Sequence, residues 1–281
     1  MSTNQTKAQR RDAARAEALA LQKKQQAREK RSRLIVMSLL GLGVAVLAVA
    51  VVMIVIWGQK TPMEKVENVP AGVVQDTGIP VGADGAAGTT NEGAKTLDVY
   101  VDYMCPICGQ FEALNGASVA EMREAGDITY VVHPVSILDR VSQGTEYSTR
   151  AASAAAWVAD QAPEQFNAFH EAMFASQPKE QTPGLSDAQI AQIAEQADVP
   201  ADVADGIASG EAHDTFGEWV AASSEVAGDD ESLFNEQGGF GTPTVVIDGE
   251  RFPGWQTPGA LTQAITGEAP ASDEPSAEPS E

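Results

Sequence analysis

The chain contains two cysteines, Cys105 and Cys108, separated by Pro106 and Ile107. Such a C-x-x-C pair can form a disulfide or supply half of the ligands of a closed zinc site. A disulfide that closes a four-residue loop would stabilise the fold by only about 2 kcal/mol, so the pair is a poor structural cross-link. The three histidines lie on different predicted elements without ligand spacing: His133, His170 and His213. The spacing therefore favours reversible thiol–disulfide exchange, with no metal and no cofactor.

The segments around the cysteines predict a strand that leads directly into a helix. Residues 97–103 alternate apolar and polar side chains, and residues 109–125 are compatible with a helix. Cys105 would then lie at the helix N-terminus, where free N–H groups and a partial positive charge stabilise a thiolate. Pro106 falls in the first turn, where its missing N–H is no loss. Cys108 lies one turn further in, placed to attack a mixed disulfide at Cys105.

The segments after this helix predict an α/β domain with a helical insertion. A β-branched run at 128–135 indicates a second strand, which a strand–helix–strand connection makes parallel to the first. The pattern is helical from about 146 to 228, and Ser186 to Gln189 form a capping box. The last predicted elements are a strand at 244–247, a turn at Asp248-Gly249, a return strand at 250–253 and a helix at 256–265.

Charge divides the chain at residue 34. Ten Lys/Arg and three Asp/Glu precede Leu34, whereas eight Lys/Arg and 37 Asp/Glu follow. An acidic domain cannot neutralise phosphates, which argues against nucleic-acid binding. Residues 34–57 are 24 residues without a charge. As a helix they would reach roughly 36 Å, enough to cross a hydrocarbon core of about 30 Å. The sequence therefore predicts one transmembrane helix at 34–57.

The basic residues before this helix place the N-terminus in the cytoplasm, and everything after the helix outside the cell membrane. A cleaved signal peptide is the alternative, since Ala48-Val49-Ala50 resembles a cleavage site, although the apolar run continues beyond it. Residues 73–74 and 79–81 could add a short strand pair to the domain. The expected organisation is a basic cytoplasmic segment (1–33), a transmembrane helix (34–57), a flexible extracytoplasmic linker (58–95), the catalytic domain (96–267) and a disordered acidic tail (268–281).

Four stretches resemble the DsbA-like branch of the thioredoxin superfamily: residues 102–108, Phe111-Glu112, residues 166–174 and residues 240–244. The resemblance covers roughly 97–267. It implies a thioredoxin-like fold with an inserted helical subdomain and a thiol–disulfide oxidoreductase activity. In that family a cis-proline faces the active cysteines, which implies a cis bond at Thr242-Pro243. A proline can open a strand without an N–H, and the Thr242 backbone could then pair with an extended substrate chain.

Ile107 departs from the strongest oxidases of that family, which often have His between the cysteines. Isoleucine offers the thiolate neither a charge nor a polar hydrogen. Asp102, if it lies close, would raise the thiol pKa through repulsion between like charges. We therefore expect a Cys105 thiolate held mainly by the helix terminus, and a less oxidising disulfide than a His-containing motif gives.

The predicted function is disulfide formation in exported proteins. Its expected partners are unfolded or reduced polypeptides and a membrane reoxidation partner or small-molecule oxidant. A reductase or isomerase with the same site, and a redox-inert membrane-anchored binding module, are alternatives. The predicted catalytic residues are Cys105 and Cys108, with Pro106, Ile107, Thr242 and Pro243 in supporting or substrate-binding roles. Three aromatic residues could line a substrate groove or pack in the core: Phe240, Phe252 and Trp255.

Overall fold

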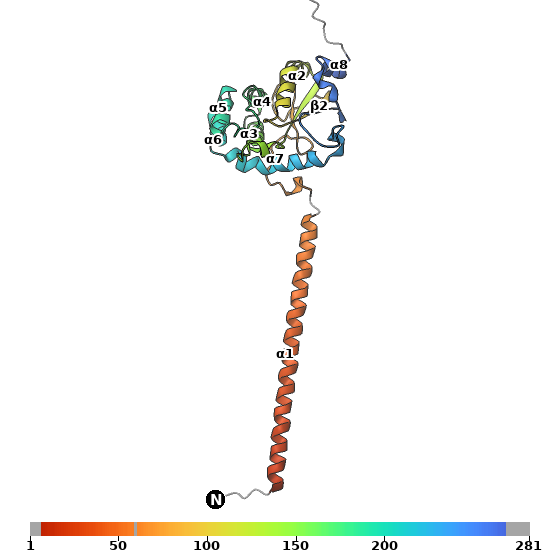
Figure 1. Ribbon diagram of the computed structural model, residues 1–281, viewed down its shortest axis with the longest axis vertical. Coiled ribbons are helices and arrows are strands. Elements are labelled where there is room, and N and C mark those ends of the chain that lie inside the picture. The colour runs from red at the N-terminus through yellow and green to blue at the C-terminus, as the bar shows by residue number, and fades with distance from the viewer. Residues whose placement is uncertain (1–6, 59–60, 268–281) are drawn as a thin grey trace, which may run out of the picture. The chain divides into compact units, whose positions relative to one another are not determined.

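The structure is a computed structural model that describes residues 7–58 and 61–267 (Figure 1). The chain divides into two compact units, residues 1–60 and residues 61–281, and each is considered by itself. The acidic tail expected at 268–281 lies outside the described residues.

The N-terminal unit is a single helix, α1 (Lys7–Gly58), of 52 residues. It continues without a break from the basic segment into the apolar run. The side chains at 15–33 and 35–53 are exposed, so the leucines and valines in these two ranges are not buried in a protein core. An exposed apolar helix surface of this kind is stable when the surrounding medium is itself apolar, as the interior of a lipid bilayer is. Within the described residues, α1 is the one helix long and apolar enough to cross a membrane.

Five strands of the second unit form one mixed sheet in the order β1-β3-β2-β4-β5. The parallel pair predicted by the strand–helix–strand connection is present, with Val99 of β2 opposite Val132 of β3. Strand β4 is antiparallel to β2, and β5 returns beside β4 after the Asp248-Gly249 turn. The strands are β1 (Ile79–Val81), β2 (Lys95–Val101), β3 (Ile128–Pro134), β4 (Thr244–Ile247) and β5 (Glu250–Arg251).

Helices cover both faces of the sheet. Helices α2 (Pro106–Ala125) and α8 (Ala260–Thr266) pack together on one face, and α7 (Glu211–Asp229) crosses the other (Figure 1). Successive side chains of β4 point to opposite faces of the sheet. Val245 joins the main core, while Val246 packs in a second cluster with Ala227 of α7. The return strand is shorter than expected, because a 3₁₀ turn at Pro253–Gln256 begins two residues after β5 ends.

The helical insertion expected at about 146–228 is present. Its first helix packs along α7, and its third opens with the predicted capping box, in which the Ser186 side chain accepts from the N–H of Gln189. Besides α7, the insertion contains α3 (Tyr147–Gln161), α4 (Phe166–Ala175), α5 (Asp187–Gln196) and α6 (Ala201–Ala208).

The segment expected as a flexible linker at 58–95 is largely part of the domain. Ile79 and Val81 are 1% and 0% exposed, and β1 extends the sheet through antiparallel pairing with β3. The Trp219 indole N–H donates to the Asp76 carbonyl at 2.8 Å, which ties the turn before β1 to α7. The alternative of an added strand is therefore closer to the structure, although β1 pairs with β3 and not with residues 73–74. Burial of Ile79 and Val81 supplies the stabilisation that a solvated linker lacks.

Candidate active site

The cysteines lie where β2 passes into α2. Cys105 is the N-cap residue of α2, and Pro106 is the first residue of the helix. The Cys108 N–H donates to the Cys105 carbonyl at 3.0 Å, which closes the first turn around the pair. Cys105 is 6% exposed and Cys108 is fully buried. Only Cys105 therefore presents any surface to a partner.

Thr242 and Pro243 reach the cysteines from the loop before β4. The Thr242-Pro243 peptide bond is cis, as the resemblance implies. The Cys105 thiol donates to the Thr242 carbonyl at 3.3 Å. The fold thus brings together two motifs that lie far apart in the sequence, and a residue bound beside Thr242 would lie next to the Cys105 sulfur.

Gln177, which follows α4, connects the helical insertion to the active-site turn. Its Nε2 donates to the carbonyls of Cys105 at 2.8 Å and Tyr103 at 3.2 Å. A Cβ on Gly109 would lie 2.6 Å from Gln177 Oε1, so glycine at this helical position leaves room for the amide. Sequence reasoning missed both residues. A glycine directly after the second cysteine, in a helix that does not favour it, was the available signal.

Hydrogen bonding makes Cys105 the more acidic thiol. The pKa of Cys105 is lowered to about 6, chiefly because the Cys108 thiol donates to its sulfur; burial opposes this effect, and the N–H groups of Cys108 and Ile107 add to the lowering. The Cys108 thiol is the largest single contributor, so a side chain adds to the stabilisation that the sequence assigned mainly to the helix terminus. The helix start still contributes, through the backbone N–H groups of Ile107 and Cys108 near the Cys105 sulfur.

Cys108 has the opposite character. Burial raises its pKa well above that of an ordinary thiol, and the neighbouring Cys105 raises it further. At neutral pH, therefore, Cys105 is largely a thiolate and Cys108 a thiol. Cys105 can therefore attack a disulfide or be attacked by a thiolate, whereas Cys108 is protonated and does not attack first.

Asp102 is a fully buried carboxyl behind the cysteines. Its oxygens accept from the N–H groups of Met104 at 2.8 Å and Leu138 at 2.9 Å. Burial raises the pKa of Asp102 to about 7; these hydrogen bonds oppose the rise, and the Cys105 thiolate adds to it. The predicted rise in the Cys105 pKa does not occur: hydrogen bonds lower that pKa to about 6, and the repulsion between the two groups raises the pKa of Asp102 instead.

The other side chains considered from the sequence divide between surface and core. Ile107 is 44% exposed and presents an apolar surface beside Cys105. Trp255 is buried and packs edge-on against Phe111 with ring centroids 5.5 Å apart, and Phe252 packs against the same core. Phe240 is partly exposed and lies edge-on to Tyr100. Core packing thus accounts for Trp255 and Phe252, and the partly exposed Phe240, two residues before Thr242, packs against the second cluster that contains Val246 and Ala227.

The histidines lie in separate hydrogen-bond networks. His133 contacts Asp98 and Thr77, each at 3.0 Å, whereas His170 contacts Tyr103 at 2.9 Å and Glu112 at 3.3 Å. Within the described residues, no group of three or more His, Cys, Asp or Glu side chains is arranged to hold a metal ion.

A family model described as Thioredoxin matches residues 86–266, which is more than half of the chain. The chain belongs to the thioredoxin family. Among solved structures it is similar to MdbA from Actinomyces oris, a thiol-disulfide oxidoreductase, with 28% identity, a TM-score of 0.59, and coverage of 76% of this chain and 98% of that one. It is also similar to DsbA from Mycobacterium tuberculosis, with 31% identity, a TM-score of 0.54, and coverage of 69% of this chain and 94% of that one.

MdbA from Corynebacterium diphtheriae, at 24% identity and a TM-score of 0.52, shares the fold. These similarities identify a DsbA-like thioredoxin fold, consistent with protein disulfide oxidoreductase activity. Among curated proteins, the serine/threonine-protein kinase PknE of Mycobacterium tuberculosis (strain H37Rv) is 29% identical over 116 residues, or 40% of this chain. The match spans only 20% of PknE, about a fifth of its length, and the kinase's own activity is not carried over.

The thiolate of Cys105 should titrate near pH 6. In the reduced protein, the rate of Cys105 alkylation by iodoacetamide should rise with pH through an inflection at about 6. Cys108→Ala removes the largest stabilising hydrogen bond, so the inflection should move upward, toward an ordinary thiol value of about 8.5. Mass spectrometry of the modified peptide provides the measurement. An inflection that is the same in both proteins would show that the Cys108 thiol does not stabilise the thiolate.

Proposed function

We propose that this protein forms disulfides in exported polypeptides by thiol–disulfide exchange at Cys105 and Cys108. The observation that carries the proposal is the unequal burial of the two thiols, which shifts their pKa values in opposite directions together with their hydrogen bonds. A thiolate at Cys105, which has 6% of its surface exposed, is paired with a protonated and fully buried Cys108. A structural disulfide has no need of such a difference, whereas exchange requires one sulfur that receives the partner and one that resolves the adduct.

The reaction starts from the Cys105–Cys108 disulfide. A substrate thiolate attacks Cys105 Sγ, the bond between the two cysteines breaks, and Cys108 leaves with the electron pair and takes up a proton. A second substrate thiolate then attacks the substrate sulfur of the mixed disulfide, and Cys105 leaves as a thiolate. The substrate has lost two electrons and gained a disulfide, and the enzyme is reduced. A membrane partner or a small-molecule oxidant must then accept these electrons.

The low pKa of Cys105 favours this direction. The thiolate exists only in the reduced enzyme, so its stabilisation favours reduction of the Cys105–Cys108 disulfide. At pH 7, a fall in the pKa from 9.0 to about 6 favours the reduced enzyme about tenfold, equivalent to about 30 mV for a two-electron couple. The effect supports an oxidase, while Ile107 supplies none of the further stabilisation that histidine would give.

Substrate binding is proposed beside Thr242. An extended polypeptide could pair with the backbone there and place its cysteine against Cys105 Sγ, which lies 3.3 Å from the Thr242 carbonyl. Ile107 and Phe240 would contribute apolar contacts to such a chain. Backbone pairing and apolar contact do not read a particular sequence, which suits an enzyme that acts on many unfolded chains.

The proposed location is the outer face of the cell membrane. The apolar residues 34–57 lie within α1 and would anchor the protein, with the basic residues 1–33 in the cytoplasm. The catalytic domain would then lie where disulfides persist and exported chains emerge.

The central test traps the exchange intermediate. Cys108→Ser cannot resolve a mixed disulfide, so cells that express this variant should accumulate adducts of exported proteins at Cys105. Nonreducing electrophoresis followed by mass spectrometry would detect them, and dithiothreitol should release them. Cys105→Ser is the matched control and should form at least about tenfold fewer adducts, since Cys108 is fully buried. Equal adduct levels in the two variants would overturn the proposal.

The reduction potential decides the direction of electron flow. For the domain in the full-length, detergent-solubilised protein, equilibration with glutathione should give a value above about −200 mV, between those of thioredoxin at about −270 mV and the oxidant DsbA at about −120 mV. A value at or below that of thioredoxin would support the reductase alternative and defeat the oxidase.

Orientation can be tested with a membrane-impermeant maleimide on intact cells. Cys105 in the Cys108→Ser variant should be labelled, because it lies outside the membrane. A cysteine introduced by Ala8→Cys, in a protein whose natural cysteines are both replaced by Ser, should be labelled only after lysis. The reverse pattern would place the catalytic domain in the cytoplasm.

A further inference from the structure

A groove between α2 and α4 begins at the active-site turn and takes no part in the exchange chemistry itself. It has a volume of about 510 Å³ and opens to solvent. Gly109, the residue directly after Cys108, lines one end of it. The Gln177 side chain, which holds the Cys105 carbonyl, lies close to Gly109. A polypeptide whose cysteine is held at Cys105 could therefore continue into this groove.

Small residues form most of the α2 wall of the groove. They recur at intervals of three and four residues, so they share one face of the helix: Gly109, Ala113, Gly116, Ala117 and Ala120. This face is about 16 Å long, which an extended chain of about five residues would span. The backbone of such a chain could approach α2 closely, because no long apolar side chain stands in the way. On the opposite wall, Phe174 of α4 offers an apolar surface.

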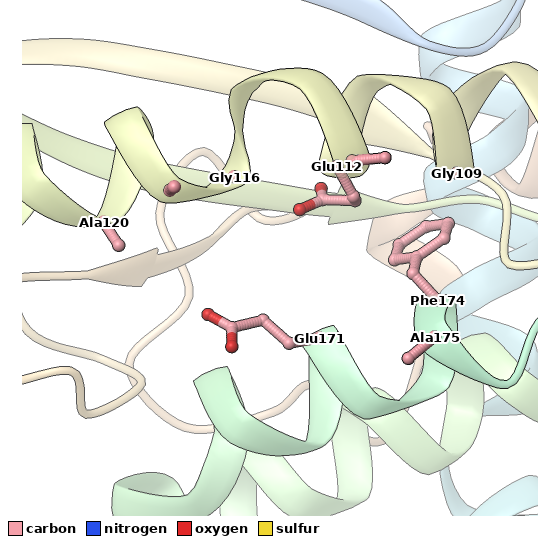
Figure 2. Close-up of a pocket in the computed structure, with 9 residues that line it drawn as sticks. Gly109, Glu112, Gly116, Ala120, Glu171, Phe174 and Ala175 are labelled. Atoms are coloured by element: carbon pink, nitrogen blue, oxygen red, sulfur yellow. The ribbon is translucent and has the colours of Figure 1, made fainter.

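Two carboxylates project into the groove from its opposite walls. Figure 2 shows Glu112 on α2 and Glu171 on α4 with their carboxylates in the space between the two helices. The Glu112 Oε1 atom accepts from the Tyr130 hydroxyl at 3.2 Å and contacts His170 Nε2 at 3.3 Å. Both partners are buried, and with Tyr103 they form a polar cluster beneath the groove. This cluster holds the Glu112 carboxylate in a fixed position.

No basic side chain neutralises this pair of carboxylates. Within residues 61–267, neither Glu112 nor Glu171 lies within ion-pair distance of a lysine or an arginine. Glu171 is exposed and accepts from the Asn167 side chain at 2.8 Å. Arg123 borders a cavity of about 10 Å³ beside the groove, but its guanidinium donates to the Gly82 carbonyl at 2.7 Å. A cation bound between the two carboxylates would therefore gain attraction that the protein itself leaves unused.

We infer that the α2–α4 groove binds a basic and apolar segment of the substrate polypeptide, with a lysine or arginine between Glu112 and Glu171 and an apolar side chain against Phe174. The inference rests on the proposed function and names a class of substrate for it. Cys105 and Glu112 are about 10 Å apart along the axis of α2, so the basic residue should lie about three to five residues from the cysteine that pairs with Cys105.

Charge argues against other occupants of the groove. From Leu34 onward the chain carries eight Lys/Arg and 37 Asp/Glu. A second copy of this domain, or an anionic lipid surface, would bring further negative charge to the two carboxylates. The basic residues 1–33 of this chain are proposed to lie on the other side of the membrane. A basic segment of an exported chain has the complementary charge and could reach the groove.

Three reduced peptides test the charge requirement. Each carries the same pair of cysteines and the same leucines, and they differ only four residues from the cysteines, where they carry Lys, Gln or Glu. The oxidised, detergent-solubilised full-length protein should oxidise the Lys peptide about fivefold faster than the Gln peptide, and the Glu peptide more slowly still. Acid quenching and reversed-phase chromatography give the rates. The advantage of the Lys peptide should shrink as salt rises, because salt screens exposed charges.

Substitutions in the groove should change the ratio of the Lys-peptide rate to the Gln-peptide rate. Glu171→Gln should lower this ratio to about twofold or less, and Glu171→Lys should make the Glu peptide the fastest. Ala117→Phe, which fills part of the groove without a change of charge, should also lower the ratio. A ratio taken within one variant cancels any effect on the cysteines themselves. Glu195→Gln, which removes an exposed carboxylate from α5, is the matched control and should keep the wild-type ratio.

The outcomes separate the inference from the proposed function. Equal rates for the three peptides would show that the groove does not select basic chains, and would overturn the inference while the proposed function stands. A ratio that is unchanged in Glu171→Gln would overturn it as well. So would an equal loss in Glu195→Gln, because the net charge of the domain would then account for the preference. A wild-type protein that oxidises none of the peptides would instead defeat the proposed function.

Discussion

The site depends on the hydrogen bond that the buried Cys108 thiol donates to the Cys105 sulfur. Burial keeps Cys108 protonated, and the proton that it retains stabilises the neighbouring thiolate. Each cysteine thus shifts the pKa of the other, downward for Cys105 and upward for Cys108. The strand-to-helix junction produces this arrangement, because it leaves Cys105 at the N-cap with little surface and carries Cys108 one turn into the core. A pair with equal exposure would lose this division of roles.

The helical insertion does more than enlarge the domain. Gln177, just after α4, holds the carbonyl of Cys105, and α4 forms the second wall of the groove into which Glu112 projects (Figure 2). His170, also on α4, completes the polar cluster beneath that groove. The insertion therefore helps to position the active-site turn and lines the side of α2 that carries Gly109 and Glu112.

The basic N-terminal segment and the acidic folded domain suit a protein that works at a membrane surface. A basic segment and an apolar run are continuous in one helix, while the folded domain is strongly acidic. The acidic charge of the domain is not what lowers the Cys105 pKa, because the lowering comes from hydrogen bonds with Cys108, with Thr242 and with the start of α2. The net charge of the domain affects its solubility, whereas the chemistry of the cysteines depends on their local geometry.

The sequence alone was enough to predict the C-x-x-C site, the strand–helix–strand unit, the helical insertion, the capping box and an apolar helix, because spacing and periodicity are local properties. The cis bond at Thr242-Pro243 followed from the family resemblance. The tertiary structure decided what depends on contacts between distant segments: β1 joins the sheet, Gln177 holds the active-site turn, and Glu112 meets Tyr130 and His170. It also decided how the thiolate is stabilised. Burial and hydrogen-bond partners set a pKa, and neither can be read from residues taken in order.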